Sequence, residues 1–136
     1  SSDLADKRKN TFTANIATAY PAEAEVESWI RSYSLQKGQL RISDSFRLTT
    51  AKQPNQINFM TWGQVNTEIP GKIQLEVKGK KAVIEYDKQL FDVKTEIIPL
   101  TDTRLSNVWG KSICRITLTA TNIYKTGNYS FTIKKQ

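Results

Sequence analysis

Four carboxylates gather in the second half of the chain, at Asp87, Asp92, Glu96 and Asp102. A pair of carboxyl groups can serve as general acid and base, as in glycoside hydrolysis, and several together can bind Ca²⁺. The spacing here fixes neither a catalytic separation nor the ligand pattern of an EF-hand, and carboxylates commonly occupy turns and surfaces. We therefore assign no catalytic residue and no metal ligand to this group.

The scarcity of His and Cys further limits the catalytic and metal-binding chemistry that the chain can carry out. The 136-residue chain has no His and a single Cys, Cys114. Without His it lacks the commonest general base and zinc ligand, and no Ser–His or Cys–His pair can form. Cys114 shares its alternation parity with Ile116 and Leu118, which predicts a small core residue rather than a reactive thiolate. We expect no cofactor, and we expect the isolated chain to be inactive.

Positive charge is the more informative feature, since 20 Lys and Arg against 13 Asp and Glu give a net charge of +7. Lys78, Lys80 and Lys81 surround a predicted glycine turn and are expected to project together from one hairpin tip, where they could bind a polyanion. The alternative is a solvated turn whose lysines protect strand edges. Nucleic acid is not expected, because RNA-binding aromatic motifs are missing and Trp29 and Tyr33 lie on a predicted buried face.

Two tryptophans stand beside glycines, as Trp62-Gly63 and Trp109-Gly110. An aromatic ring near a turn can stack on a sugar, but a Trp beside Gly more often covers a closely approaching backbone. We favour the structural interpretation for both pairs.

The elements that must position these residues are strands. Apolar and polar residues alternate with a period of two, and the runs end at turn residues such as Lys37-Gly38 and Pro70-Gly71. The predicted strands cover residues 27–35, 40–48, 57–62, 73–77, 83–86, 90–98, 112–120 and 129–134. No segment between them has a helical period long enough for a crossover helix, so the pattern predicts an all-β, antiparallel β-sandwich of about eight strands. One helical turn is predicted at residues 21–26, where Pro21 fits a first helical position.

The length allows one domain with one core. Residues 1–15 are predicted to form an exposed N-terminal arm, and residues 16–136 a single domain. No apolar run is long enough for a membrane helix, so no membrane span is expected. The alternation predicts a core made mostly of the following residues: Trp29, Tyr33, Leu35, Leu40, Ile42, Phe46, Leu48, Ile73, Leu75, Val77, Ile116, Leu118, Phe131 and Ile133.

Two stretches carry a resemblance to a known family. Residues 16–35 and 42–48 resemble the later part of the C-terminal β-sheet domain of bacterial heparinase II/III-like polysaccharide lyases. The second half of the chain shows further similar positions in the same order, namely Tyr86-Asp87, Phe91, Glu96, Leu100-Thr101-Asp102, Leu105, Trp109-Gly110 and Arg115-Ile116. These positions look architectural, so the resemblance assigns no chemistry to any single residue.

The resemblance implies a secreted or periplasmic bacterial enzyme that cleaves acidic polysaccharides by β-elimination. Its catalytic residues, typically His and Tyr, would belong mostly to an α/α-toroid domain, which this chain does not contain, and to earlier parts of the sheet domain. The resemblance therefore implies a fragment: the non-catalytic β-sandwich portion of such a lyase, packed beside the toroid and shaping the cleft for an acidic polysaccharide. The other hypothesis is a stand-alone carbohydrate- or protein-binding module.

Overall fold

The computed structural model describes residues 11–15, 24–100 and 112–136, and these ranges contain strands and no helix. The ten strands are β1 (Thr11–Asn15), β2 (Ala24–Gln36), β3 (Gln39–Ala51), β4 (Gln56–Thr61), β5 (Gln64–Asn66), β6 (Lys72–Val77), β7 (Lys80–Glu85), β8 (Phe91–Pro99), β9 (Ser112–Ala120) and β10 (Thr126–Lys135). All pairings between them are antiparallel. The predicted all-β, antiparallel class is confirmed.

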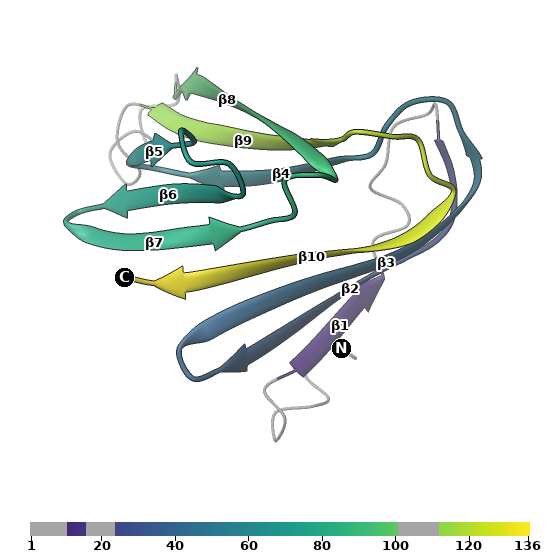
Figure 1. Ribbon diagram of the computed structural model, residues 1–136, viewed down its shortest axis with the longest axis horizontal. Helices are drawn as coiled ribbons and strands as arrows, with labels where there is room; N and C mark the ends of the chain where they lie inside the picture. Colours follow the sequence, from purple (N-terminus) through teal and green to yellow (C-terminus); the bar gives the residue numbers. More distant parts are fainter. Residues whose placement is uncertain (1–10, 16–23, 101–111) are drawn as a thin grey trace.

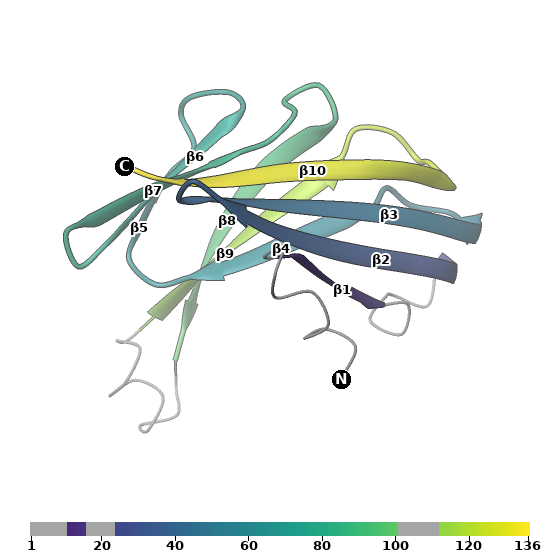
Figure 2. The same cartoon turned by 90° about the horizontal axis from the view of Figure 1, so that it is seen from below.

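The strands form two sheets that lie over one another (Figure 1). The larger has seven strands in the order β1-β2-β3-β10-β7-β6-β5, and the smaller has three in the order β4-β9-β8. The long hairpin of β2 and β3 lies beside β10 (Figure 2). On its other side β10 pairs with β7, so the last strand of the chain joins the β1-β2-β3 part of the larger sheet to the β7-β6-β5 part. Each sheet therefore has one face toward the other sheet and one outer face.

Two tight turns show how local sequence sets the register. Lys37 and Gly38 join β2 to β3 with φ of 51° and 76°, and Lys78 and Gly79 join β6 to β7 with φ of 52° and 79°. Two consecutive residues with positive φ make the two-residue hairpin loop whose twist matches that of the strands. The residues flanking the first turn, Gln36 and Gln39, are direct partners as a result.

The core lies between the two sheets and draws on both. Trp29, Phe46 and Tyr129 from the larger sheet form an aromatic group, with ring centroids of Phe46 4.9 Å from those of the other two. Ile116 and Leu118 of β9 are fully buried against it. Since a single cluster contains residues of both sheets, the arrangement is sandwich-like.

Most predicted core residues are buried or half-buried, and the exception is Leu35, which is 50% exposed. Leu35 pairs with Leu40 beside the Lys37-Gly38 turn, at the end of the hairpin, where an inward-facing side chain has neighbours on one side only. Cys114 is buried and free, which confirms its assignment to the core.

Two expectations about the elements need correction. The described residues form ten strands rather than about eight, because β1, with only Phe12 and Ala14 apolar, and the three-residue β5 are too short for their alternation to predict a strand. β1 falls within the expected N-terminal arm and is held by backbone pairing to β2, which requires no particular side chains. The helical turn expected at residues 21–26 is wrong for 24–26, where β2 has already begun.

Candidate functional site

Asp92 and Glu96 lie too far apart to act as a catalytic pair. Asp92 and Glu96 are four residues apart on the same face of β8, about 13 Å at 3.3 Å per residue, which exceeds the separations found in glycosidases. Glu96 is also bonded to Arg115 at 2.9 Å. Asp87 accepts a hydrogen bond from the Gln89 backbone N–H at 2.9 Å and so closes a turn. Asp102 lies outside the described residues.

Lys78, Lys80 and Lys81, which we call the lysine tip, do not all project from one side of the hairpin. Lys78 occupies the β6–β7 turn, as expected, but Lys80 and Lys81 are neighbours on β7 and so point to opposite faces of the hairpin. Lys81 Nζ lies 3.9 Å from Glu76 Oε1, which offsets its charge. The structure does not gather the three ammonium groups at one place, and their role in binding stays a prediction.

Gly63 explains the first Trp-Gly pair. Its φ is 112°, and a Cβ there would collide with the Glu76 carbonyl oxygen of the neighbouring strand. The glycine therefore permits a close backbone approach, whereas the Trp62 side chain beside it is 39% exposed. Trp109 and Gly110 lie outside the described residues.

The outer face of the larger sheet has a different character. The adjacent strands β2, β3 and β10 are in direct register and present five outward positions each, in five rows of three. We call these fifteen positions the hydroxyl face: Ser28, Ile30, Ser32, Ser34 and Gln36 on β2; Gln39, Arg41, Ser43, Ser45 and Arg47 on β3; Thr126, Asn128, Ser130, Thr132 and Lys134 on β10. None of them is buried, and Figure 2 looks onto this side of the sheet.

Hydroxyls dominate the hydroxyl face, on eight of the fifteen residues, and three carboxamides, three cations and one isoleucine complete it. The middle row is Ser32, Ser43 and Ser130. Each hydroxyl can both donate and accept a hydrogen bond, and each carboxamide offers two donors and an acceptor. The face therefore presents a regular array of neutral hydrogen-bonding groups.

Carboxylates are missing from this array. Within residues 28–36, 39–47 and 126–134 the only acid is Asp44, and Asp44 lies on the opposite, core-facing side of the sheet. There it is buried and accepts two hydrogen bonds from Arg31, from Nε at 2.7 Å and from Nη2 at 2.8 Å. The bond to Asp44 raises the pKa of the Arg31 guanidinium. This internal pair is neutral as a unit and leaves the charge of the hydroxyl face unchanged.

The cations of the hydroxyl face differ in their partners. Lys134 Nζ lies 2.9 Å from Glu85 Oε1 of β7. Arg41 and Arg47 are exposed and have no carboxylate partner among the described residues. They are six residues apart on β3, about 20 Å at 3.3 Å per residue. The hydroxyl face thus carries two available guanidinium groups separated by small hydroxyls.

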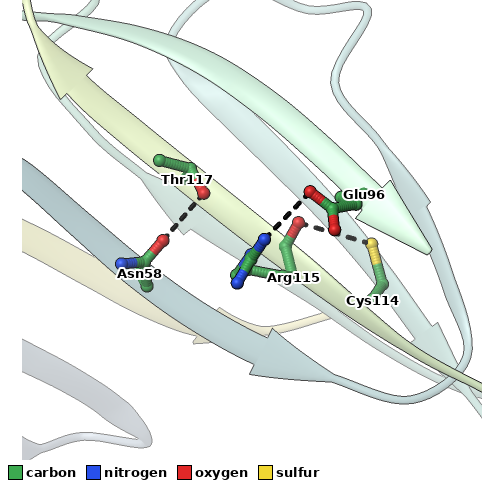
Figure 3. A network of polar contacts seen from close by, with 5 residues as sticks. All are labelled: Asn58, Glu96, Cys114, Arg115 and Thr117. Atoms are coloured by element: carbon green, nitrogen blue, oxygen red, sulfur yellow. Dashed lines mark hydrogen bonds and ion pairs between the residues drawn. The ribbon is translucent and has the colours of Figure 1, made fainter. Parts of the chain in front are cut away.

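The outer face of the smaller sheet contrasts with it. Here a shallow hollow of about 540 Å³ is lined by Gln56, Asn58, Asp92, Val93, Lys94, Arg115, Thr117 and Thr119. Its polar groups bond to one another: Thr117 donates to Asn58 Oδ1 at 2.7 Å, and Arg115 donates to Glu96 at 2.9 Å (Figure 3). The lining has one acidic side chain, Asp92, and two basic ones, Lys94 and Arg115, of which Arg115 is paired with Glu96 beside the hollow. This face has fewer unpaired groups to offer a charged ligand.

Two further observations limit the chemistry of the described residues. No group of three His, Cys, Asp or Glu side chains in residues 11–15, 24–100 and 112–136 could hold a metal ion. In the same ranges no helix is long and apolar enough to cross a membrane.

The chain matches no protein-family model, and no curated protein matches it either. The resemblance to heparinase II/III-like lyases is therefore still a prediction.

Sequence reasoning missed the hydroxyl face, although part of its signal was visible. Ser28, Ser32 and Ser34 alternate with apolar residues along one strand, as Ser43 and Ser45 do along the next. What the sequence did not show is that β10 would lie beside β3 and add a third column of hydroxyls.

Proposed function

We propose that the chain is a non-catalytic β-sandwich module that binds an acidic polysaccharide along its hydroxyl face. The observation that carries this proposal is the pair of guanidinium groups of Arg41 and Arg47, which have no carboxylate partner in residues 11–15, 24–100 and 112–136 and lie within an array of hydroxyls that contains no carboxylate. Guanidinium groups bind carboxylates and sulfates through two parallel hydrogen bonds. Hydroxyls and carboxamides match the hydroxyls of the sugar rings between the acidic groups.

The size of the hydroxyl face supports an extended ligand. The arginines lie about 20 Å apart along β3, so one ligand that contacts both must span several sugar units. The face has one apolar side chain, Ile30, so binding rests on hydrogen bonds and charge. Such binding weakens as salt shortens the range of electrostatic attraction, from about 30 Å at 0.01 M to about 8 Å at 0.15 M.

The test compares two variants that change the net charge equally. Arg41→Gln/Arg47→Gln removes both cations of the hydroxyl face, and Lys78→Gln/Lys80→Gln removes two cations of the lysine tip. Each lowers the net charge by two, from +7 to +5. Binding to heparin, alginate and neutral dextran is measured by isothermal titration calorimetry at low and physiological salt.

We expect the unaltered chain to bind the two acidic polymers and to ignore dextran. The arginine variant should lose about tenfold or more in affinity, since each charge-assisted contact contributes about 1.5–3 kcal/mol. The affinity of the lysine variant for the acidic polymers should fall about twofold, as expected for a change in overall charge alone. Equal losses in the two variants, or a larger loss in the lysine variant, contradict the proposal.

The larger setting implied by the resemblance is a separate proposal. It places this module beside the α/α-toroid of a periplasmic or secreted polysaccharide lyase. The full reading frame upstream of Ser1 tests it, because the toroid requires several hundred residues of helical-hairpin pattern. An assay of the chain alone for unsaturated uronate products, read by ultraviolet absorbance, tests the expectation that it is inactive.

A further inference from the structure

One end of the hydroxyl face is hollowed. A small depression of about 100 Å³ is lined by Ser34 and Gln36 of β2, Gln39 and Arg41 of β3, and Thr132 of β10. Ser34, Arg41 and Thr132 form one row of the face, and Gln36 and Gln39 belong to the next row, beside the β2–β3 turn. The depression exists where the long Arg41 side chain stands between two short ones.

The lining has one charge, and it is positive. The other four side chains are two hydroxyls and two carboxamides, all able to donate hydrogen bonds. The nearest carboxylate in the same row is that of Glu85 on β7, one strand beyond Thr132. Glu85 Oε1 is already paired with Lys134 Nζ at 2.9 Å. Arg41 is therefore surrounded by neutral donors, and no carboxylate in the part of the chain that the structure describes is paired with it.

Size restricts what can enter. A water molecule occupies about 30 Å³ in the liquid, so the depression has room for about three waters. That volume suits one small oxyanion group, a carboxylate or a sulfate, attached to a sugar ring that stays outside.

We propose that the depression around Arg41 is the subsite that holds a single acidic group of the polysaccharide and so fixes the chain's register on the hydroxyl face. This inference rests on the proposed function and deepens it. Arg41 donates two hydrogen bonds to the oxyanion, and Ser34, Thr132 and the two glutamines can supply the rest. Arg47, at the other end of the face, contributes attraction along the chain without defining its position.

The experiment uses small probes that cannot reach both arginines. Backbone amide shifts of the ¹⁵N-labelled chain are followed by NMR during titration with methyl glucuronide, glucosamine 6-sulfate and methyl glucoside. The first two carry a carboxylate and a sulfate and so distinguish the two sources of the oxyanion, and the third is neutral. We expect at least one acidic probe to shift the amides of residues 34–41 and 132 and the neutral probe to leave them unchanged.

Arg41→Gln and Arg47→Gln are a matched pair on one strand and one face. Arg41→Gln should weaken the acidic probe about tenfold or more, and Arg47→Gln should leave its affinity within about twofold. Arg41→Lys keeps the positive charge but loses the planar guanidinium with its two parallel N–H donors. Its affinity for the acidic probe should lie between those of the two Gln variants. Both positions are exposed, and an unchanged spectrum away from the face shows that each variant is folded.

The outcomes separate this inference from the proposed function. Equal weakening by the two Gln variants, or shifts that persist in Arg41→Gln, overturn the subsite even if the polymers still bind to the hydroxyl face. Failure of the unaltered chain to bind any acidic polymer overturns both.

Discussion

The buried pair of Arg31 and Asp44 gives the sharpest test of how the larger sheet is held together. The Asp44 side chain is fully buried and that of Arg31 is 18% exposed, and two hydrogen bonds of 2.7 and 2.8 Å join them. Asp44→Asn keeps the shape of the side chain, removes its charge, and turns one acceptor into a donor that faces the guanidinium.

Breaking a buried ion pair by removing one partner costs about 3–5 kcal/mol, because the remaining charge is left without compensation. Arg31 keeps some contact with water, so we expect the lower end, about 3 kcal/mol for Asp44→Asn. A domain of this kind has a free energy of unfolding of about 5–15 kcal/mol, so the loss is a large fraction of its stability.

Urea unfolding followed by tryptophan fluorescence measures this cost, since Trp29 is fully buried in the adjacent core. Glu96→Gln is the control: it breaks the exposed pair with Arg115 and should cost less than about 1 kcal/mol. The double variant Arg31→Met/Asp44→Leu removes both charges and should recover most of the loss. A cost below about 1 kcal/mol for Asp44→Asn, or a double variant no more stable than the single one, would refute the reasoning.

Two further predictions concern the core. Leu118→Ala truncates a fully buried side chain and should lower the free energy of unfolding by about 2–5 kcal/mol in the same urea assay, whereas a change below about 1 kcal/mol would contradict its burial. Burial raises the pKa of the Tyr129 phenol, against the opposing hydrogen bond that Asn55 Nδ2 donates to its oxygen at 2.9 Å. The folded state therefore binds the phenolic proton more tightly than the unfolded state, whose pKa is about 10, so this contribution is complete below pH 10 and is lost as the pH rises above it. The midpoint of thermal unfolding should fall less between pH 9 and 11 for Tyr129→Phe than for the unaltered chain. Equal falls in the midpoint would contradict a raised pKa of Tyr129.

Local sequence was enough to predict most of the strands and much of the core. The period-two alternation around Trp29 and Phe46 identifies the inward face of the long hairpin, because successive side chains of a strand point to opposite faces. The Lys-Gly pairs mark the two tight turns, since glycine adopts positive φ without strain. The parity of Cys114 with Ile116 likewise places the thiol in the core.

The pairing of the strands and its register decided the rest. β1 and β5 have only two and one apolar residues, too few to predict a strand, and they are strands because neighbouring edges offer backbone hydrogen bonds. Arg31 and Asp44 are thirteen residues apart and meet only because the β2–β3 register sets them opposite each other on the inward face.

The hydroxyl face shows most clearly which features depend on the sequence alone and which depend on the tertiary structure. Alternating serines along residues 28–34 and 43–45 are a property of the sequence, and so is the excess of positive charge. The sequence left open which cations would have partners and which strands would lie together, and it favoured the lysines at the β6–β7 turn. The tertiary structure points Lys80 and Lys81 to opposite faces and leaves Arg41 in a row with Ser34 and Thr132. The physical reason is that alternation is set by each strand alone, whereas a binding face requires several strands, and their order and register depend on how the whole chain buries its apolar surface.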